Sequence, residues 1–329
     1  MGLREYLIKR IIISIILIFG VLTVNFLIFE AMPGNPLENY ISRLALSGRE
    51  DIQQLVEQMR EEWGLDKPIL EKYTIYIRNM LTFNLGESVI RGRTKVADLL
   101  WERIPNTLLL LGTSSVFAIV IGTVIGVLAA YKRESLFDSS MVLFSLLTFS
   151  LPVFWMGMIL QGIFGFQLKI LPIFGTTSIP PPKDFFAYWI DRIYHLILPG
   201  FTLFLFTYGN YVLLARACVL ETITEDYVIT AKAKGLKDRT ILFKHVLRNA
   251  SLPIITNAAL TFGFILSGAI ITETVFNYAG MGTLVYNAIM QKDVPVMQGF
   301  FYITALTVII ANLIADLAYG VLDPRVRYG

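Results

Sequence analysis

Few residues of this chain have the type and spacing that catalysis requires. The sequence contains two histidines, His195 and His245, and a single cysteine, Cys218, so neither a histidine–cysteine metal site nor a disulfide within the chain is expected. No lysine is followed by Ser or Thr, which excludes a P-loop and hence ATP hydrolysis by this chain. Gly-x-Ser-x-Gly and His-Glu-x-x-His motifs are also absent. We therefore predict no catalytic residue, no bound metal and no bound cofactor.

A different task is indicated by the polar stretch 224–253, which interrupts an apolar part of the sequence. Thr224 is expected to N-cap a short helix, with Asp226 near the positive end of the helix dipole. Lys232 stands in the last turn, and Gly235 follows where a left-handed residue often ends a helix. A polar helix that ends in a glycine turn is suited to gripping a partner, not to reaction chemistry.

A second helix is expected to begin at Asp238 and to run toward Pro253, which marks the entry to the next hydrophobic run. Its apolar residues recur at helical spacing and should form one buried face. They are Ile241, Leu242, Val246 and Leu247.

The elements around this stretch have the composition of a membrane protein. Of 329 residues, 55% are hydrophobic and only 16% are charged, unlike a soluble domain of this length. Six windows lack Asp, Glu, Lys and Arg and meet or approach the roughly 20 residues that cross a bilayer. They are 11–29, 104–131, 139–168, 193–215, 249–272 and 294–315. We predict an all-α polytopic membrane protein with six transmembrane helices. Nucleic acid is not an expected partner, because the sequence contains no basic block with interleaved aromatic residues.

The flanking charges orient these spans. Arg4, Lys9 and Arg10 precede the first window, as they would in a signal peptide. However, the apolar run is longer than that of a usual signal peptide, and the residues after it form a poor cleavage site. We therefore expect a retained span. Basic residues of the short loops fall on one side of a six-span chain, which predicts cytoplasmic termini and a cytoplasmic 224–253 stretch. Residues 33–103 would then form an extracytoplasmic insert with helices near 49–62 and 70–81. We expect this insert to cap the outer mouth or to receive a partner, and a folded loop with no binding role is the alternative.

Several stretches form a set that runs in order along nearly the whole chain. They are Trp63-Gly-Leu-Asp-Lys-Pro68, Asn84-Leu-Gly-Glu-Ser88, Ser150-Leu-Pro-Val-Phe-Trp155, His195-Leu-Ile-Leu-Pro199, Asp293-Val-Pro-Val-Met-Gln-Gly299 and Asp323-Pro-Arg-Val-Arg327. Together with residues 226–236 and 243–253 they resemble the permease subunits of bacterial ABC importers for dipeptides, oligopeptides and nickel. In that family 226–236 corresponds to the cytoplasmic EAA loop. Ile229 and Thr230 replace the Glu-Ala of the general pattern, so the family's glutamate contact is not carried over.

The resemblance implies the type I ABC importer permease fold, with an N-terminal transmembrane helix (1–32), the extracytoplasmic insert (33–103) and a five-helix core (104–329) containing a coupling loop (217–250). It implies a multi-pass protein of the bacterial inner or plasma membrane, surrounded by membrane lipid. The implied partners are a second homologous permease, two cytoplasmic ABC ATPase subunits that bind ATP and Mg, and an extracytoplasmic solute-binding protein. Peptides are the expected cargo, with nickel complexes or oligosaccharides as alternatives. Outside the family, a secondary transporter and a membrane scaffold are the rivals, but no inverted repeat is evident.

The resemblance also assigns the coupling residues, which would dock into a cleft on the ATPase and move with it as a lever. They are Asp226, Tyr227, Thr230, Ala231, Lys232, Ala233, Lys234, Gly235 and Leu236. From the pattern alone, a basic helix lying on anionic lipid headgroups is an equally open interpretation.

Ionisable residues at the ends of the windows complete the candidates. Glu273 closes the fifth window, either as part of an outer gate or as a solvated helix end. Asp316 is expected to pair structurally with a cation such as Arg325, although an acid near the membrane is also a functional candidate. Arg216 and Glu221 are expected to form a local ion pair.

Overall fold

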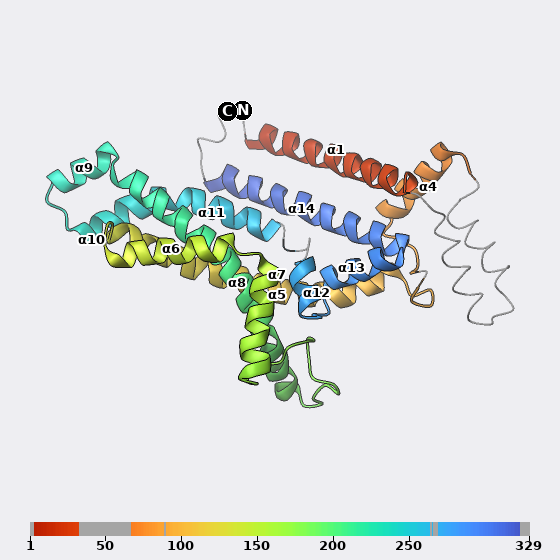
Figure 1. The fold of residues 1–329 in the computed structure, drawn as a ribbon. Coiled ribbons are helices and arrows are strands. Elements are labelled where there is room, and N and C mark those ends of the chain that lie inside the picture. The colour runs from red at the N-terminus through yellow and green to blue at the C-terminus, as the bar shows by residue number, and fades with distance from the viewer. Residues whose placement is uncertain (1–2, 33–66, 89, 264, 266–268, 323–329) are drawn as a thin grey trace. The chain divides into compact units, whose positions relative to one another are not determined.

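The structure is a computed structural model that describes residues 3–32, 67–88, 90–263, 265 and 269–322 (Figure 1). These residues are mostly helical and, within those ranges, contain no strand beyond one isolated bridge between Glu87 and Lys95. The predicted helix at 49–62 and the side chains of Asp316 and Arg325 lie outside the described residues. The elements are α1 (Leu3–Glu30), α4 (Ile69–Leu81), α5 (Val96–Tyr131), α6 (Leu136–Ser150), α7 (Val153–Leu160), η1 (Gln161–Gln167), α8 (Phe185–Ile223), α9 (Asp226–Ala233), α10 (Asp238–Thr240), η2 (Ile241–Val246), α11 (Leu247–Gly263), α12 (Ile270–Val275), α13 (Met281–Gln291) and α14 (Val294–Leu322).

The described chain supplies several membrane-spanning helices. Four are long and apolar enough to cross a bilayer: Ile8–Glu30, Val96–Tyr131, Phe185–Ile223 and Val294–Ile314. A fifth candidate is a bent pair of helices, Leu136–Ser150 with Val153–Gln167. The predicted all-α polytopic membrane class is therefore confirmed. The count of six stays a prediction, because the window 249–272 is represented by α11 and by residues that are only partly described.

The predicted third span, 139–168, is wrong as one continuous helix. Its two halves bend by 102° at the Leu151–Pro152 step. Pro152 has no N–H to continue the hydrogen-bond ladder, and its ring disfavours helical backbone at the residue before it. Leu151 accordingly adopts extended backbone, with φ −77° and ψ 136°. Counting charge-free residues does not detect such a break.

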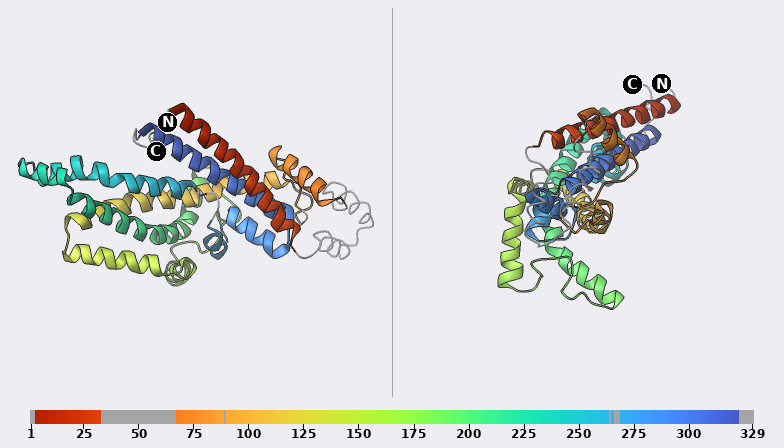
Figure 2. Two further views of the ribbon diagram at one scale, coloured as in Figure 1. Left: turned by 90° about the horizontal axis from the view of Figure 1, so that it is seen from above. Right: turned by 90° about the vertical axis from the view of Figure 1, so that its right-hand side faces the viewer.

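The helices divide into two compact units, Met1–Pro105 with Gly280–Gly329, and Asn106–Ala279. In the first unit α1 lies along α14, as both views of Figure 2 show. Asn25 of α1 donates a buried hydrogen bond of 2.8 Å from Nδ2 to the hydroxyl of Tyr76 on α4. This helix, Ile69–Leu81, confirms the one predicted at 70–81. A buried bond of 2.5 Å from Ser88 Oγ to Asp293 Oδ2 fastens the segment after α4 to the start of α14.

In the second unit α5 and α6 pack closely against α8. Glycines allow the approach: a Cβ added at Gly122 of α5 would lie 2.7 Å from the Cβ of Tyr211, and one added at Gly209 of α8 would collide with the backbone oxygen of Ser145 on α6. Backbones that approach through small residues are a usual form of helix packing in membranes. The close contact makes α8 a firm support for the short helix α9, which comes next in the sequence.

Candidate functional site

Two residues, Thr224 and Glu225, separate the end of α8 from the start of the short helix α9. Thr224 is the C-cap of α8, and its Oγ1 donates a hydrogen bond of 2.7 Å to the backbone oxygen of Glu221. The residue before α9 is Glu225, so the prediction that Thr224 caps this helix is wrong. The reason is that α8 continues past the charge-free window to Ile223, which places Thr224 at the end of one helix and not at the start of the next.

The glycine turn after α9 is confirmed. Gly235 has a φ of +75°, in the left-handed region that favours glycine. Its N–H donates a bond of 2.9 Å to the oxygen of Lys232, which closes the last turn of α9. A Cβ at this position would touch nothing within 4 Å, so backbone conformation, not crowding, selects glycine here.

One face of α9 belongs to the core of the chain. Val228 has no exposed surface and Ala231 only 5%. They pack in a cluster with buried residues of α5, α8, η2 and α11: Val127, Ala130, Cys218, Val219, Ile241, Leu242, Val246 and Ala250. Full burial of a valine side chain such as that of Val228 contributes about 1.5–3 kcal/mol. The helix is therefore attached to the transmembrane helices through its inner face.

Burial of Ala231 corrects the predicted docking set. Ala231 faces the chain's own core, whereas the other eight predicted residues between Asp226 and Leu236 are exposed. Sequence reasoning also missed Ile229, which is 56% exposed on the outer side. The exposed residues of 226–236 are called the docking face below. With only eight residues, α9 is too short for its inner side to be read from periodicity.

The second predicted helix is present as a continuous rod of α10, η2 and α11. Ile241, Leu242 and Val246 are buried and Leu247 is partly buried against the same cluster, which confirms the predicted apolar face. Pro253 lies inside α11 and not at its entry. Asn249 of α11 donates a bond of 2.7 Å from Nδ2 to the hydroxyl of Tyr227, which ties α11 to α9.

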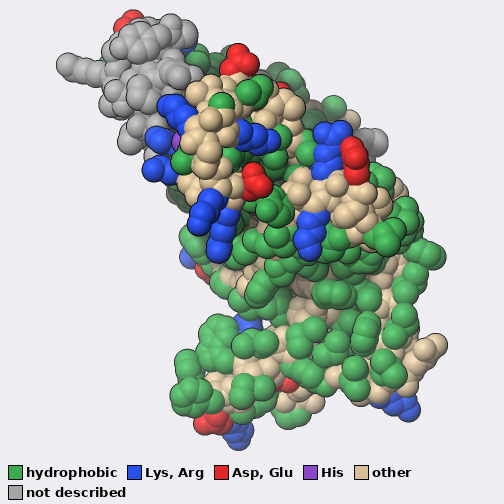
Figure 3. All heavy atoms as spheres, turned by 90° about the vertical axis from the view of Figure 1, so that its left-hand side faces the viewer, with side chains coloured by type: hydrophobic (Ala, Val, Ile, Leu, Met, Phe, Trp, Pro, Cys, Tyr) green, Lys and Arg blue, Asp and Glu red, His purple; other side chains and the backbone are tan. Residues whose placement is uncertain are grey.

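Basic side chains gather around this end of the second unit. Figure 3 looks toward α9 and shows Lys and Arg side chains over that part of the surface. They include Lys232, Lys234, Lys237, Arg239 and Lys244, all of which are exposed. Of these five cations, only Lys232 and Lys234 belong to the docking face, where exposed Asp226 and apolar residues accompany them.

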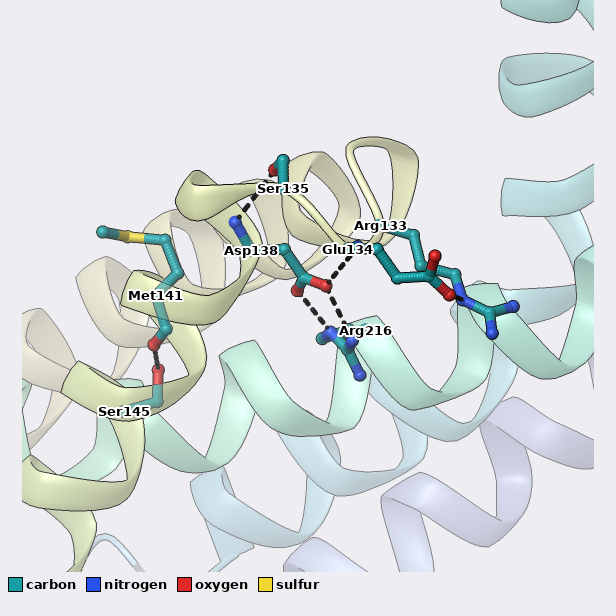
Figure 4. A network of polar contacts seen from close by, with 7 residues as sticks. All are labelled: Arg133, Glu134, Ser135, Asp138, Met141, Ser145 and Arg216. Atoms are coloured by element: carbon teal, nitrogen blue, oxygen red, sulfur yellow. Dashed lines mark hydrogen bonds and ion pairs between the residues drawn. The ribbon is translucent and has the colours of Figure 1, made fainter.

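A buried ion pair fixes the start of α6 to α8 next to this region (Figure 4). Arg216 approaches Asp138 with Nε at 2.6 Å from Oδ1 and Nη2 at 2.8 Å from Oδ2. Asp138 also accepts a bond of 3.1 Å from the backbone N–H of Glu134, and Ser135 caps α6 through the N–H of Asp138. The predicted local pair of Arg216 with Glu221 is wrong, because the partner is a carboxylate 78 residues away in sequence.

A second polar cluster lies near the other end of α8. Thr107 of α5 donates a bond of 2.9 Å to Oε1 of Glu273, which has no exposed surface. The interpretation of Glu273 as a solvated helix end is therefore wrong. The N–H of Tyr278 donates a bond of 2.8 Å to the backbone oxygen of Glu273. Burial raises the pKa of Tyr278 to about 12.

Arg192 of α8 extends this cluster. Its Nη2 donates to Oδ1 of Asn106, and its guanidinium lies 5.5 Å from the ring centre of Trp189 and also contacts Tyr188. Nδ2 of Asn106 donates a bond of 2.6 Å to the backbone oxygen of Ala279. Three chain segments thus meet here: α5, the start of α8, and residues 273–279.

Comparison with protein families agrees with this arrangement of apolar helices and a polar helix–turn–helix loop. Residues 122–328 match the model of the binding-protein-dependent transport system inner membrane component, and residues 3–111 match the N-terminal model of the same kind of component. The chain belongs to the family of binding-protein-dependent transport system inner membrane components, the permeases of ABC importers.

Relatives of known designation cover the whole length. The oligopeptide transport system permease protein AppB of Bacillus subtilis is 34% identical over 327 residues, covering 99% of this chain and 100% of the relative. The di/tripeptide transport system permease protein DppB of Pseudomonas aeruginosa and the dipeptide transport system permease protein DppB of Escherichia coli are each 34% identical, covering 98% of this chain and 99% of the relative.

Membership fixes the general character of the chain. It is a multi-pass inner-membrane permease and is not the catalytic part of its transporter, because ATPase activity in such systems lies in partner subunits. The family implies a complex with ATPase and binding-protein partners. The two candidate sites therefore concern binding and movement, not bond chemistry.

Proposed function

We propose that this chain forms half of the translocation pathway of an ATP-driven importer of di- or oligopeptides, delivered by a solute-binding protein. The proposal is supported by the full-length similarity to permeases whose names specify dipeptide or oligopeptide transport. In this arrangement, a second homologous permease completes the pathway. Two ATPase subunits carry ATP and Mg, and both termini and α9 face the cytoplasm.

The observation that carries the mechanism is the two-sided character of α9. Its inner face is packed with Val127 of α5 and Val219 of α8, while its docking face is exposed. A displacement imposed on the docking face is therefore passed to α5, α8 and α11 through packed side chains and not through a flexible linker. Closure of the ATPase pair on ATP then moves these helices between discrete packed arrangements, giving alternating access.

We assign the second polar cluster to the outer gate. Glu273 and Thr107 join residues 273–279 to α5, and Arg192 with Asn106 joins α8 to α5 and to Ala279. Buried polar bonds of this kind hold only in specific geometry, so a shift of α8 against α5 exchanges one satisfied arrangement for another. We further propose the domain organisation expected from the sequence. Residues 1–32 form an N-terminal span, residues 33–103 an extracytoplasmic insert, and residues 104–329 the permease core with its coupling loop 217–250.

Cysteine cross-linking tests the docking assignment. In a Cys218→Ala background, Ile229→Cys on the docking face should form a cross-link to an ATPase subunit in native membranes. Val228→Cys, its buried neighbour, serves as the matched control and should form none. Equal cross-linking at both positions, or cross-linking at neither with the complex intact, would reject the docking face.

Uptake identifies the cargo. Deletion of the gene should abolish accumulation of labelled di- and oligopeptides and leave nickel and oligosaccharide uptake unchanged, and restoring the chain should restore peptide uptake. Loss of nickel or oligosaccharide accumulation with normal peptide uptake would assign the same machinery to the alternative cargo. Transport that continues when ATP is depleted but a proton gradient is kept would favour a secondary transporter.

A further inference from the structure

The segment after the Gly235 turn carries an open basic hollow on its exposed side. Lys237, Arg239, Thr240, Phe243 and Lys244 line a hollow of about 500 Å³. The Arg239 guanidinium lies 5.9 Å from the centre of the Phe243 ring. In the part of the chain that the structure describes, none of these three cations forms an ion pair. The hollow thus presents three positively charged side chains, one hydroxyl and one aromatic ring.

The helix that leaves this hollow changes character along one exposed face. Arg248 lies one turn beyond Lys244 and is exposed, and Leu252 and Ile255 follow at i+4 and i+7 from Arg248. Leu252 is 53% exposed and Ile255 51%. With α11 as part of the predicted span 249–272, a face that passes from cations to exposed aliphatic side chains within about 16 Å runs from the headgroup layer into the hydrocarbon. This places the hollow at headgroup depth.

We propose that the hollow binds the phosphate headgroup of an anionic phospholipid of the cytoplasmic leaflet, with an acyl chain lying along the Leu252 and Ile255 face of α11. Lys237, Arg239 and Lys244 supply the charge that attracts a phosphate, and the Thr240 hydroxyl donates to one of its oxygens. The exposed Phe243 ring provides an apolar contact at the boundary between headgroup and acyl chain. This assignment depends on the proposed cytoplasmic orientation of the loop.

Charge complementarity alone would also admit an acidic protein surface. The exposed apolar face beyond the hollow favours lipid. A protein docked at the hollow would leave Leu252 and Ile255 uncovered, whereas a phospholipid would contact the hollow with its headgroup and these two side chains with its acyl chain. The site is separate from the docking face, because it begins beyond Leu236 and faces outward from η2. Ile241 and Leu242, which lie between its lining residues, pack in the same cluster as Val228 and Ala231 of α9. A bound lipid therefore steadies the support on which the docking helix moves.

Lipid enrichment in the purified full transporter tests the proposal. The complex is reconstituted in bilayers of equal molar parts phosphatidylcholine and phosphatidylglycerol, extracted in mild detergent, and its retained lipids are measured by mass spectrometry. Wild type should retain phosphatidylglycerol in excess, and Arg239→Gln/Lys244→Gln should lower that excess about fivefold or more. The matched control Lys132→Gln/Arg133→Gln removes two charges from the α5–α6 turn and should leave the excess unchanged. Adding inorganic phosphate during extraction should not displace the lipid.

Three results would overturn the proposal. The first is an unchanged phosphatidylglycerol excess in Arg239→Gln/Lys244→Gln. The second is an equal loss in the control variant, which would mean attraction by overall charge. The third is unchanged lipid with loss of ATPase subunits, which would assign the hollow to a protein partner. The lipid measurement does not depend on transport, so failure of the permease assignment would appear separately, as absence of ATPase subunits from the wild-type preparation.

Discussion

Replacing Arg216 by methionine should destabilise the chain by leaving a buried carboxylate without its cation. The Asp138 side chain is only 4% exposed, whereas that of Arg216 is 27% exposed. Removing one member of a buried pair costs about 3–5 kcal/mol, and partial exposure of the arginine places the expected loss near 3 kcal/mol. Asp138→Asn should cost about 1 kcal/mol, because Arg216 can turn toward water and the Asn oxygen still accepts from the Glu134 N–H.

The double variant Asp138→Asn/Arg216→Met separates the pair from its surroundings. It contains no unpaired buried charge, so its loss should be about 2 kcal/mol, smaller than the sum of the single losses. The resulting coupling energy of about 2 kcal/mol lies in the range found for residues in direct contact. The measurement is a denaturant titration of the purified chain in detergent, followed by tryptophan fluorescence, for all four proteins of the cycle. Losses that add within about 0.5 kcal/mol would refute a direct Asp138–Arg216 interaction.

Three further perturbations have defined outcomes. Gly235→Pro should leave membrane insertion intact and uncouple ATP hydrolysis from uptake, because proline cannot adopt a φ of +75° or donate a hydrogen bond to Lys232. Gly235→Asn should retain most transport, because asparagine tolerates left-handed backbone. Normal uptake by the proline variant would contradict a role of the Gly235 turn in coupling. Gly209→Val should lower thermal stability, because the added side chain forces α6 away from α8. Overpacking of this kind costs about 1–3 kcal/mol or more. An unchanged unfolding midpoint would contradict the close contact between the two helices. Glu273→Gln, which still accepts from Thr107, should transport better than Glu273→Leu, and equal uptake by both would remove Glu273 from the gate.

Features set by local sequence were predictable. The turn at Gly235 follows from one glycine after a short helix, and α4 follows from amphipathic spacing between a proline and a polar turn. The membrane class follows from charge-free windows, because the bilayer penalises each buried charge wherever it comes in the sequence. These signals lie within a few turns of the residues they describe.

Features set by distant contacts were not predictable. Buried Glu273 accepts a hydrogen bond from Thr107, which lies on a helix far earlier in the chain. Arg216 pairs with Asp138 and not with the nearby Glu221, because the capped start of α6 places the Asp138 carboxylate next to it. The positions of α5 and α8 determine which face of α9 is buried. Eight residues are too few for a hydrophobic period to predict that face. In each case the deciding partner is brought in by tertiary packing.

The two-sided construction of α9 has a consequence for how such transporters diversify. Since Val228 and Ala231 hold the helix in the chain's own core, Ile229 and Lys232 on the other side take no part in that packing. These outer positions are therefore open to exchange, in nature or by design, without rebuilding the membrane helices. Under the proposed docking, exchanges confined to these outer positions would match each permease to its own ATPase.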